Sequence, residues 1–203
     1  MAEAGQIKKA IDGDKDALSG LVIGVQKELY NLALRMLWHP EDAEDATQEI
    51  IIKIITKLST FEGKSSFKTW AWRIAINHLL NTRKRRAEKD NISFEEMTQD
   101  LDTFLADDSL PVEDKVQQKL LVEEAKIGCM QAMLLCLKRD ERAAYIMGDV
   151  FGITDAEGAS MFDVSPAAYR KRLSRARQHI RTFMDNNCGI DIFFTLLKFF
   201  CIL

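Results

Sequence analysis

The stretch from Phe61 to Arg86 interleaves aromatic rings with positively charged side chains. Aromatic faces stack on unpaired bases, which contributes about 1–3 kcal/mol per base, and cationic side chains neutralise phosphates and hold a strand in register. This stretch therefore predicts contact with an unpaired nucleic-acid strand. The side chains assigned to that contact are Lys64, Ser65, Ser66, Phe67, Lys68, Trp72, Arg73, Asn77, Arg83, Lys84, Arg85 and Arg86. The alternative is that Phe67, Trp70, Ile74 and Ile76 belong to a core, and the four-residue spacing of Trp70 and Ile74 favours the core for that pair.

A second basic stretch, residues 141–181, has the layout of a helix-turn-helix preceded by a leading helix. Ser165 is a good N-cap, and Pro166 suits the first helical position. Because arginine pairs bidentately with guanine, the helix that follows can in principle read sequence in the major groove. The residues assigned to this contact are Ser165, Arg170, Lys171, Arg172 and Arg175. A solvated basic helix is the alternative.

The charge of the chain is segregated along the sequence. The formal net charge is only −3, so bulk charge does not favour nucleic acid. However, residues 64–89 hold eight basic and one acidic side chain, whereas residues 90–114 hold nine acidic and no basic ones. Such sign asymmetry indicates interaction with a polyanion, although each block alone could be a solvated face.

Apolar residues at three-and-four spacing predict helices over residues 14–38, 41–59 and 66–88, with a loop at 60–65. Residues 116–137 resume that periodicity, and residues 140–184 read as three shorter helical pieces. The fold predicted is all-α: two small helical domains, 1–88 and 116–184, the second a helix-turn-helix domain. Residues 89–115, which are acidic and lack a sustained period, are predicted to be a linker. Residues 185–203 form an apolar tail.

No constellation for catalysis or metal binding is evident in the sequence. His39, His78 and His179 are far apart, no Gly-rich phosphate loop is present, and the four cysteines contain no CxxC pair. We therefore expect no enzyme, no metal, no cofactor and no small-molecule substrate. Residues 1–16 lack the apolar run of a signal peptide, so the expected location is the cytoplasm, with reduced thiols.

The last fifteen residues, GIDIFFTLLKFFCIL, are densely apolar. They fall short of the roughly 20 residues that a membrane-spanning helix needs. A partner-docking segment and a non-native end produced by a shifted reading frame both remain open.

Three motifs occur in order: DAEDATQEIIIKI (42–54), FEGKSSFKTWAWRIAIN (61–77) and KRLSRARQHIR (171–181). In this order and spacing the chain resembles the extracytoplasmic-function group of bacterial RNA polymerase sigma factors, over roughly residues 10–183. The resemblance implies a subunit that binds core RNA polymerase and directs initiation at promoters with −10 and −35 elements. It also implies restraint by an anti-sigma protein.

The resemblance assigns roles to particular segments. Residues 10–88 would melt the promoter, with residues 62–68 capturing a base of the −10 element and Asn77 close to that DNA. The core-polymerase contact is assigned to Asp42, Asp45, Gln48 and Glu49, of which the last three match positions that dock on the coiled coil of the largest polymerase subunit. Residues 116–184 would read the −35 element through the basic helix, and the linker would pass near the RNA exit path.

The chain departs from the family pattern in its helix-turn-helix. Gly158 replaces a branched apolar residue, Asp163 stands where glycine is common, and Tyr169 is bulkier than usual. Two other functions therefore remain open: a stand-alone helix-turn-helix regulator, which leaves residues 42–77 unexplained, and a polymerase-binding decoy that no longer reads DNA.

Overall fold

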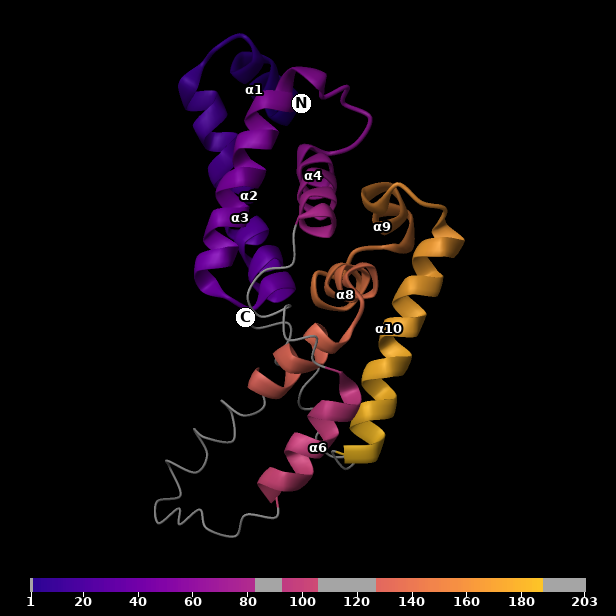
Figure 1. The fold of residues 1–203 in the computed structure, drawn as a ribbon. Coiled ribbons are helices and arrows are strands. Elements are labelled where there is room, and N and C mark those ends of the chain that lie inside the picture. The colour runs from indigo at the N-terminus through magenta and orange to yellow at the C-terminus, as the bar shows by residue number, and fades with distance from the viewer. Residues whose placement is uncertain (1, 83–92, 106–126, 188–203) are drawn as a thin grey trace.

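The computed structural model describes residues 2–82, 93–105 and 127–187, and all regular structure in these ranges is helical (Figure 1). The predicted all-α class is confirmed. We call residues 2–82 the N-terminal half and residues 127–187 the C-terminal half.

The N-terminal half contains α1 (Ala2–Ile11), α2 (Lys15–Leu37), α3 (Pro40–Lys57), a 3-10 turn η1 (Leu58–Thr60) and α4 (Phe67–Asn81). Helix α2 begins where Asp14 accepts hydrogen bonds from the amides of Asp16 and Ala17. Helix α3 begins with Pro40. Proline suits this position because a backbone N–H in the first turn has no helical partner. Both helices agree with the prediction.

Helix α4 is shorter than the sequence predicted. It ends at Asn81, and Thr82 adopts an extended conformation while its hydroxyl donates to the carbonyl of His78 at 2.7 Å. The predicted end at residue 88 was therefore wrong. The basic run Arg83–Arg86 lies outside the described residues.

The C-terminal half contains a helical segment at 127–136, α8 (Arg139–Tyr145), a π-helical turn η2 (Ile146–Val150), α9 (Asp155–Phe162) and α10 (Pro166–Asn187). Gly152 permits the break before α9 because its φ is +66°. Asp163 ends α9 in the left-handed conformation, φ 54° and ψ 46°, where the family pattern favours glycine. The helix-turn-helix layout matches the prediction.

Part of the predicted linker is a helix. Residues Phe94–Leu105 form α6, whose start is fixed by reciprocal bonds between Ser93 and Glu96. The ring of Phe94 contacts Phe183 of α10 with centroids 5.5 Å apart, so α6 lies against the C-terminal end of α10 (Figure 1). The prediction of no sustained helical period was wrong here.

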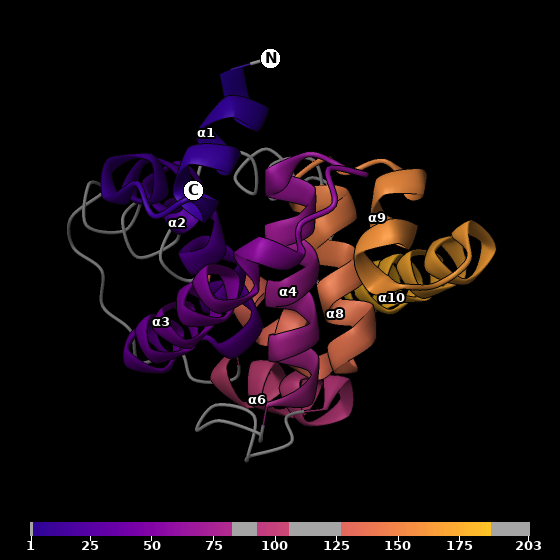
Figure 2. The same cartoon turned by 90° about the horizontal axis from the view of Figure 1, so that it is seen from above.

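One continuous apolar core joins the two halves. Seen from above, α4 lies between the α2–α3 pair and the C-terminal helices α8 and α9 (Figure 2). Helix α4 contributes Ala71, Trp72 and Ala75 to this core, and α9 contributes Ala159. The half that carries the predicted −10 residues is thus packed against the helix-turn-helix.

Candidate nucleic-acid interface

Helix α3 presents three of its four predicted polymerase contacts on one exposed face. Asp45, Gln48 and Glu49 are exposed, whereas Asp42 is 5% exposed in the first turn, where a negative charge interacts favourably with the helix dipole. The opposite face carries buried alanine and isoleucine residues, which fix the orientation of the helix. The structure does not bring Asp42 onto the same surface as the other three.

The exposed face of α3 continues into two isoleucines that the sequence reasoning did not single out. Ile52 is 60% exposed and Ile55 is 40% exposed, one turn apart and in line with Gln48. The signal that could have found them is the isoleucine run itself, because a single helical face cannot bury every residue from Ile50 to Ile55.

A groove of about 530 Å³ runs between α2 and α3 beside Gln48. Its lining includes Ile23, Tyr30 and Ile51. The surface available to a partner helix is therefore mixed, with polar groups at the start of α3 and apolar ones beside it.

The loop before α4 positions most of the predicted −10 residues. Ser66 caps α4 by accepting from the Thr69 amide at 3.1 Å, and Gly63 has a φ of +69°. Lys64 and Ser65 are exposed beside it, with Lys64 paired to Glu62. Lys68 is also exposed and forms an ion pair with Glu28 at 2.7 Å. These polar side chains are accessible to a strand.

Most aromatic rings of the same stretch are packed against other rings of the protein. Phe67 is buried and packs with Phe61 and Trp70, with centroids 6.2 and 5.8 Å from it. Trp72 is 2% exposed and stacks on Phe151 of the C-terminal half with centroids 5.4 Å apart. In this conformation neither Phe67 nor Trp72 can stack on a base. The structure supports the core interpretation for Phe67, and it also buries Trp72, which the sequence assigns to nucleic-acid contact.

Arg73 and Asn77 lie further along α4. Arg73 forms a 2.9 Å ion pair with Asp163, the left-handed residue of the helix-turn-helix. Asn77 is exposed on a concave surface of about 460 Å³ between α3 and α4, together with Lys53, Lys57 and Asn81. This surface is accessible, whereas Arg73 is engaged.

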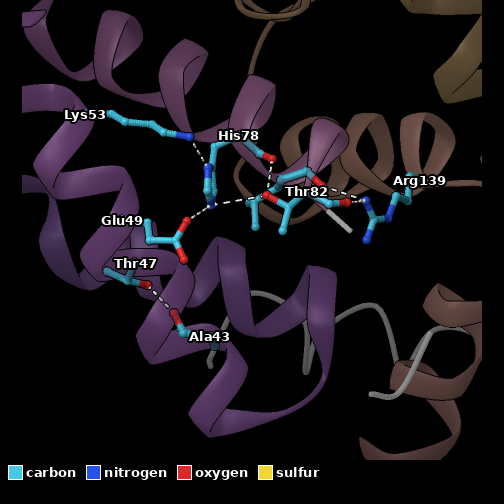
Figure 3. Close-up of polar contacts among 8 residues, drawn as sticks. Ala43, Thr47, Glu49, Lys53, His78, Thr82 and Arg139 are labelled. Carbon is cyan, nitrogen blue, oxygen red and sulfur yellow. Dashed lines mark hydrogen bonds and ion pairs between the residues drawn. The ribbon is translucent and has the colours of Figure 1, made fainter. Parts of the chain in front are cut away.

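A polar cluster connects α3, α4 and α8 around the buried ring of His78 (Figure 3). Lys53 Nζ donates to His78 Nδ1 at 2.5 Å, which places the ring proton on Nε2. Nε2 then faces Thr82 Oγ1 at 3.3 Å and Glu49 Oε2 at 3.6 Å. Arg139 of α8 donates to the carbonyl of Thr82 (Figure 3). The exposed carboxylate of Glu49 is therefore linked through His78 and Thr82 to Arg139 of the C-terminal half.

The helix-turn-helix is built around a fit between two of the unusual residues. A Cβ on Gly158 would lie 2.3 Å from Cζ of Tyr169, whose side chain is fully buried. The Tyr169 hydroxyl donates to the carbonyl of Ala144 at 3.3 Å, which connects α10 to α8. Burial raises the pKa of this phenol to about 12.

Four arginines of α10 are paired with carboxylates of their own half. The ion-pair distances are 3.8 Å for Arg170–Asp155, 3.4 Å for Arg172–Asp140, 3.8 Å for Arg175–Glu141 and 2.6 Å for Arg177–Asp149. The Arg177 fork donates to both Asp149 oxygens, and this hydrogen bonding raises the pKa of Arg177. Glu141 is almost fully buried.

The side of α10 opposite its buried residues carries a different set of groups. Lys171, Ser174 and Gln178 are all exposed there, at three-and-four spacing. Ser165 caps the helix by accepting from the Ala168 amide at 3.2 Å. Of the predicted −35 residues, Lys171 is thus the one that points away from the paired flanks, and Ser174 and Gln178 join it on that ridge.

Over the described ranges, no set of three or more histidine, cysteine or acidic side chains is grouped as a metal site would require. No helix in those ranges is both long and apolar enough to cross a membrane.

Family models and relatives agree on one assignment. A model described as Sigma-70 region 2 matches residues 21–89, and one described as Sigma-70, region 4 matches residues 127–180. The chain is 29% identical over 177 residues to the RNA polymerase sigma-H factor of Pseudomonas aeruginosa, covering 86% of this chain and 89% of that protein. It is 28% identical over 178 residues to the ECF RNA polymerase sigma-E factor of Haemophilus influenzae, covering 86% and 90%.

The fold has a counterpart among solved structures. CnrH, solved in complex with the cytosolic domain of CnrY, superposes with a TM-score of 0.66 at 19% identity. The match covers 92% of this chain and 99% of that one, so it extends over both halves.

Proposed function

The chain belongs to the extracytoplasmic-function group of bacterial RNA polymerase sigma factors, and we propose that it docks on core polymerase through α3 and reads promoters through α4 and α10. The observation that carries this proposal is the division of exposed polar groups between the two matched regions. Asp45, Gln48 and Glu49 share one face of α3 within the region 2 match, and Lys171 lies on the outward ridge of α10 within the region 4 match.

The docking surface consists of the acidic start of α3 and the isoleucines that follow it. A helical partner carrying basic and apolar side chains complements such a face. Asp45 and Glu49 supply the charge, and Ile52 and Ile55 supply apolar area that water otherwise covers. Because Asp42 is buried, it supports docking only indirectly, by stabilising the first turn of α3.

The −10 surface comprises the exposed groups of the loop and of α4. Lys64, Ser65 and Lys68 approach an unpaired strand at the helix start, and Asn77 contacts it further along. Arg73 joins them once its pair with Asp163 is broken. Arg83, Lys84, Arg85 and Arg86 remain assigned to phosphate contacts by their charge alone.

The −35 surface is the outward ridge of α10. Lys171 contacts base edges or phosphates there, and Ser165 holds the helix start near the backbone. Arg170, Arg172 and Arg175 flank the ridge and are held in place by Asp155, Asp140 and Glu141. A carboxylate behind a guanidinium orients it without removing its outer N–H donors.

We further propose a cytoplasmic, non-catalytic factor with two functional units, residues 1–88 and 116–184, linked by residues 89–115, and regulation by an anti-sigma protein. CnrH is complexed with the cytosolic domain of a second protein, and this chain shares its fold. A stand-alone regulator is not favoured, because such a protein has no use for the region 2 surface.

The experiment is capture of purified core RNA polymerase by the tagged full chain. Wild type should retain core stoichiometrically, and the Gln48→Lys/Glu49→Lys variant should lose that retention. The control is Asp12→Lys, a charge reversal at an exposed residue between α1 and α2. Retention by the double variant would refute the docking surface, and duplex binding without any capture of core by wild type would identify a stand-alone regulator.

A further inference from the structure

Two arginines on one turn of α8 reach helix ends in the other half. Arg139 Nη1 donates to the carbonyls of Leu79 and Leu80, at 3.2 and 3.4 Å, and to that of Thr82. Arg142 Nη1 donates to the carbonyl of Met36 at 2.5 Å. These acceptors belong to the last turns of α4 and α2, including the residue after α4, where backbone carbonyls lack helical partners.

Both arginines are suited to the C-terminal ends of helices. The negative end of a helix dipole favours a cation, and each arginine supplies that cation together with directed N–H donors. Arg142 is 3% exposed, and its Nη2 also donates to the carbonyls of Leu135 and Leu137 in its own half. A single residue thus joins the end of α2 to the segment that leads into α8.

The far side of the same interface involves residues of the −10 surface. Trp72 stacks on Phe151, and the Arg35 guanidinium lies 5.9 Å from the same ring. Burial at this position lowers the pKa of Arg35. Arg73 pairs with Asp163 in the turn of the helix-turn-helix. The contacts at both ends of the interface cross from α2 or α4 to α8, η2 or the turn after α9.

We propose that Arg139, Arg142, Phe151 and Asp163 form an intramolecular clasp that holds the free chain closed and keeps Trp72 and Arg73 of α4 from an unpaired −10 strand. The closed state occupies Trp72 and Arg73 and fixes the distance between α4 and α10. The clasp itself depends only on the contacts above. Its consequence for DNA rests on the proposed function.

The test compares the full-length wild type with Arg139→Gln/Asp163→Asn, which weakens one contact at each end of the interface and leaves Arg73 free to bind DNA. Asparagine tolerates the left-handed conformation of position 163. Arg177→Gln is the matched control, because it removes an arginine ion pair formed entirely within the C-terminal half. Small-angle X-ray scattering gives the radius of gyration, which is about 17 Å for a compact chain of this length. Binding of a fluorescent single-stranded −10 oligonucleotide is measured on the same samples.

We expect wild type and Arg177→Gln to be compact and the double variant to expand by several ångström, with unchanged helical circular dichroism and at least fivefold tighter oligonucleotide binding. If the double variant loses helicity, Phe151→Ala replaces it with the same expectation. A wild type that is already extended overturns the clasp, as does a helical variant that stays compact. Neither result bears on core capture, so failure of the clasp is distinguishable from failure of the proposed function.

Discussion

The ring of Tyr169 occupies the space that Gly158 leaves on α9. A Cβ at position 158 would lie within 2.7 Å of three ring atoms. Two residues that each depart from the family pattern are therefore complementary. Together with the bond from the Tyr169 hydroxyl to Ala144, they fix α10 against both α8 and α9.

This fit predicts that the effect of Gly158→Ala on the free energy of unfolding changes sign with the residue at position 169. With Tyr169 present, the added methyl group should lower the free energy of unfolding by about 1–3 kcal/mol through overpacking. In the Tyr169→Leu background the same change should raise it by up to about 1 kcal/mol, because alanine is the better helix former. Urea unfolding of the four chains measures the coupling. Equal effects in both backgrounds would show that the ring and the glycine do not interact.

Much of this fold follows from local pattern. The spacing from Leu18 to Leu37 predicts α2, and Ser165 with Pro166 predicts the start of α10. Helix α6 was not predicted, because an acidic composition is typical of a linker, although Phe94 and Met97 stand at helical spacing. The end of α4 was missed because the basic run after it continues a helix-compatible composition.

The site was less predictable than the fold. Trp72 and Phe151 are 79 positions apart, and no local pattern indicates that they stack. Likewise, the basic stretch of α10 predicts DNA contact, but the pairing of its arginines depends on where α8, η2 and α9 place their carboxylates. Periodicity identifies which face of a helix is buried, and tertiary packing decides what covers it.

The ridge of α10 predicts two distinct phenotypes. Lys171→Ala should weaken binding of holoenzyme to promoter DNA and reduce its salt slope by about 1, with an unchanged melting temperature. Arg175→Ala should also lower the free energy of unfolding by about 1–3 kcal/mol, because the buried Glu141 loses a partner. Filter binding at several salt concentrations and thermal melts separate the two. Indistinguishable behaviour of the variants would contradict the division into ridge and flank.

The thiol of Cys136 predicts an alkaline pH dependence. Burial raises its pKa from 9.0 to about 11, so the folded chain holds the proton more tightly than the unfolded chain. The stability it contributes is present below about pH 9 and is lost as pH rises toward 11. Peptide-resolved alkylation with iodoacetamide should find Cys136 slow at pH 9 in the native chain and rapid in urea. Rapid native labelling at pH 8 would mean that the pKa of this half-buried thiol is not raised.

The buried imidazole predicts a link between α3 and the C-terminal half. His78→Ala should remove the group that joins Glu49 and Lys53 to Thr82 and so loosen the end of α4 beneath Arg139. Hydrogen exchange should accelerate for amides from Leu79 to Thr82 and stay unchanged in α10. His179→Ala is the matched control, since that half-exposed ring contacts Glu141 in the other half. Unchanged protection at Leu79 in the His78 variant would show that the cluster does not support this helix end.

Mapping of transcription start sites with purified core polymerase and the full chain, on genomic DNA from the source organism, tests the central claim most directly. The account predicts discrete start sites that core alone does not produce, each preceded by shared −10 and −35 sequences, and their loss with Gln48→Lys/Glu49→Lys. Start sites indistinguishable from those of core alone, obtained with a chain shown to be folded, would contradict it.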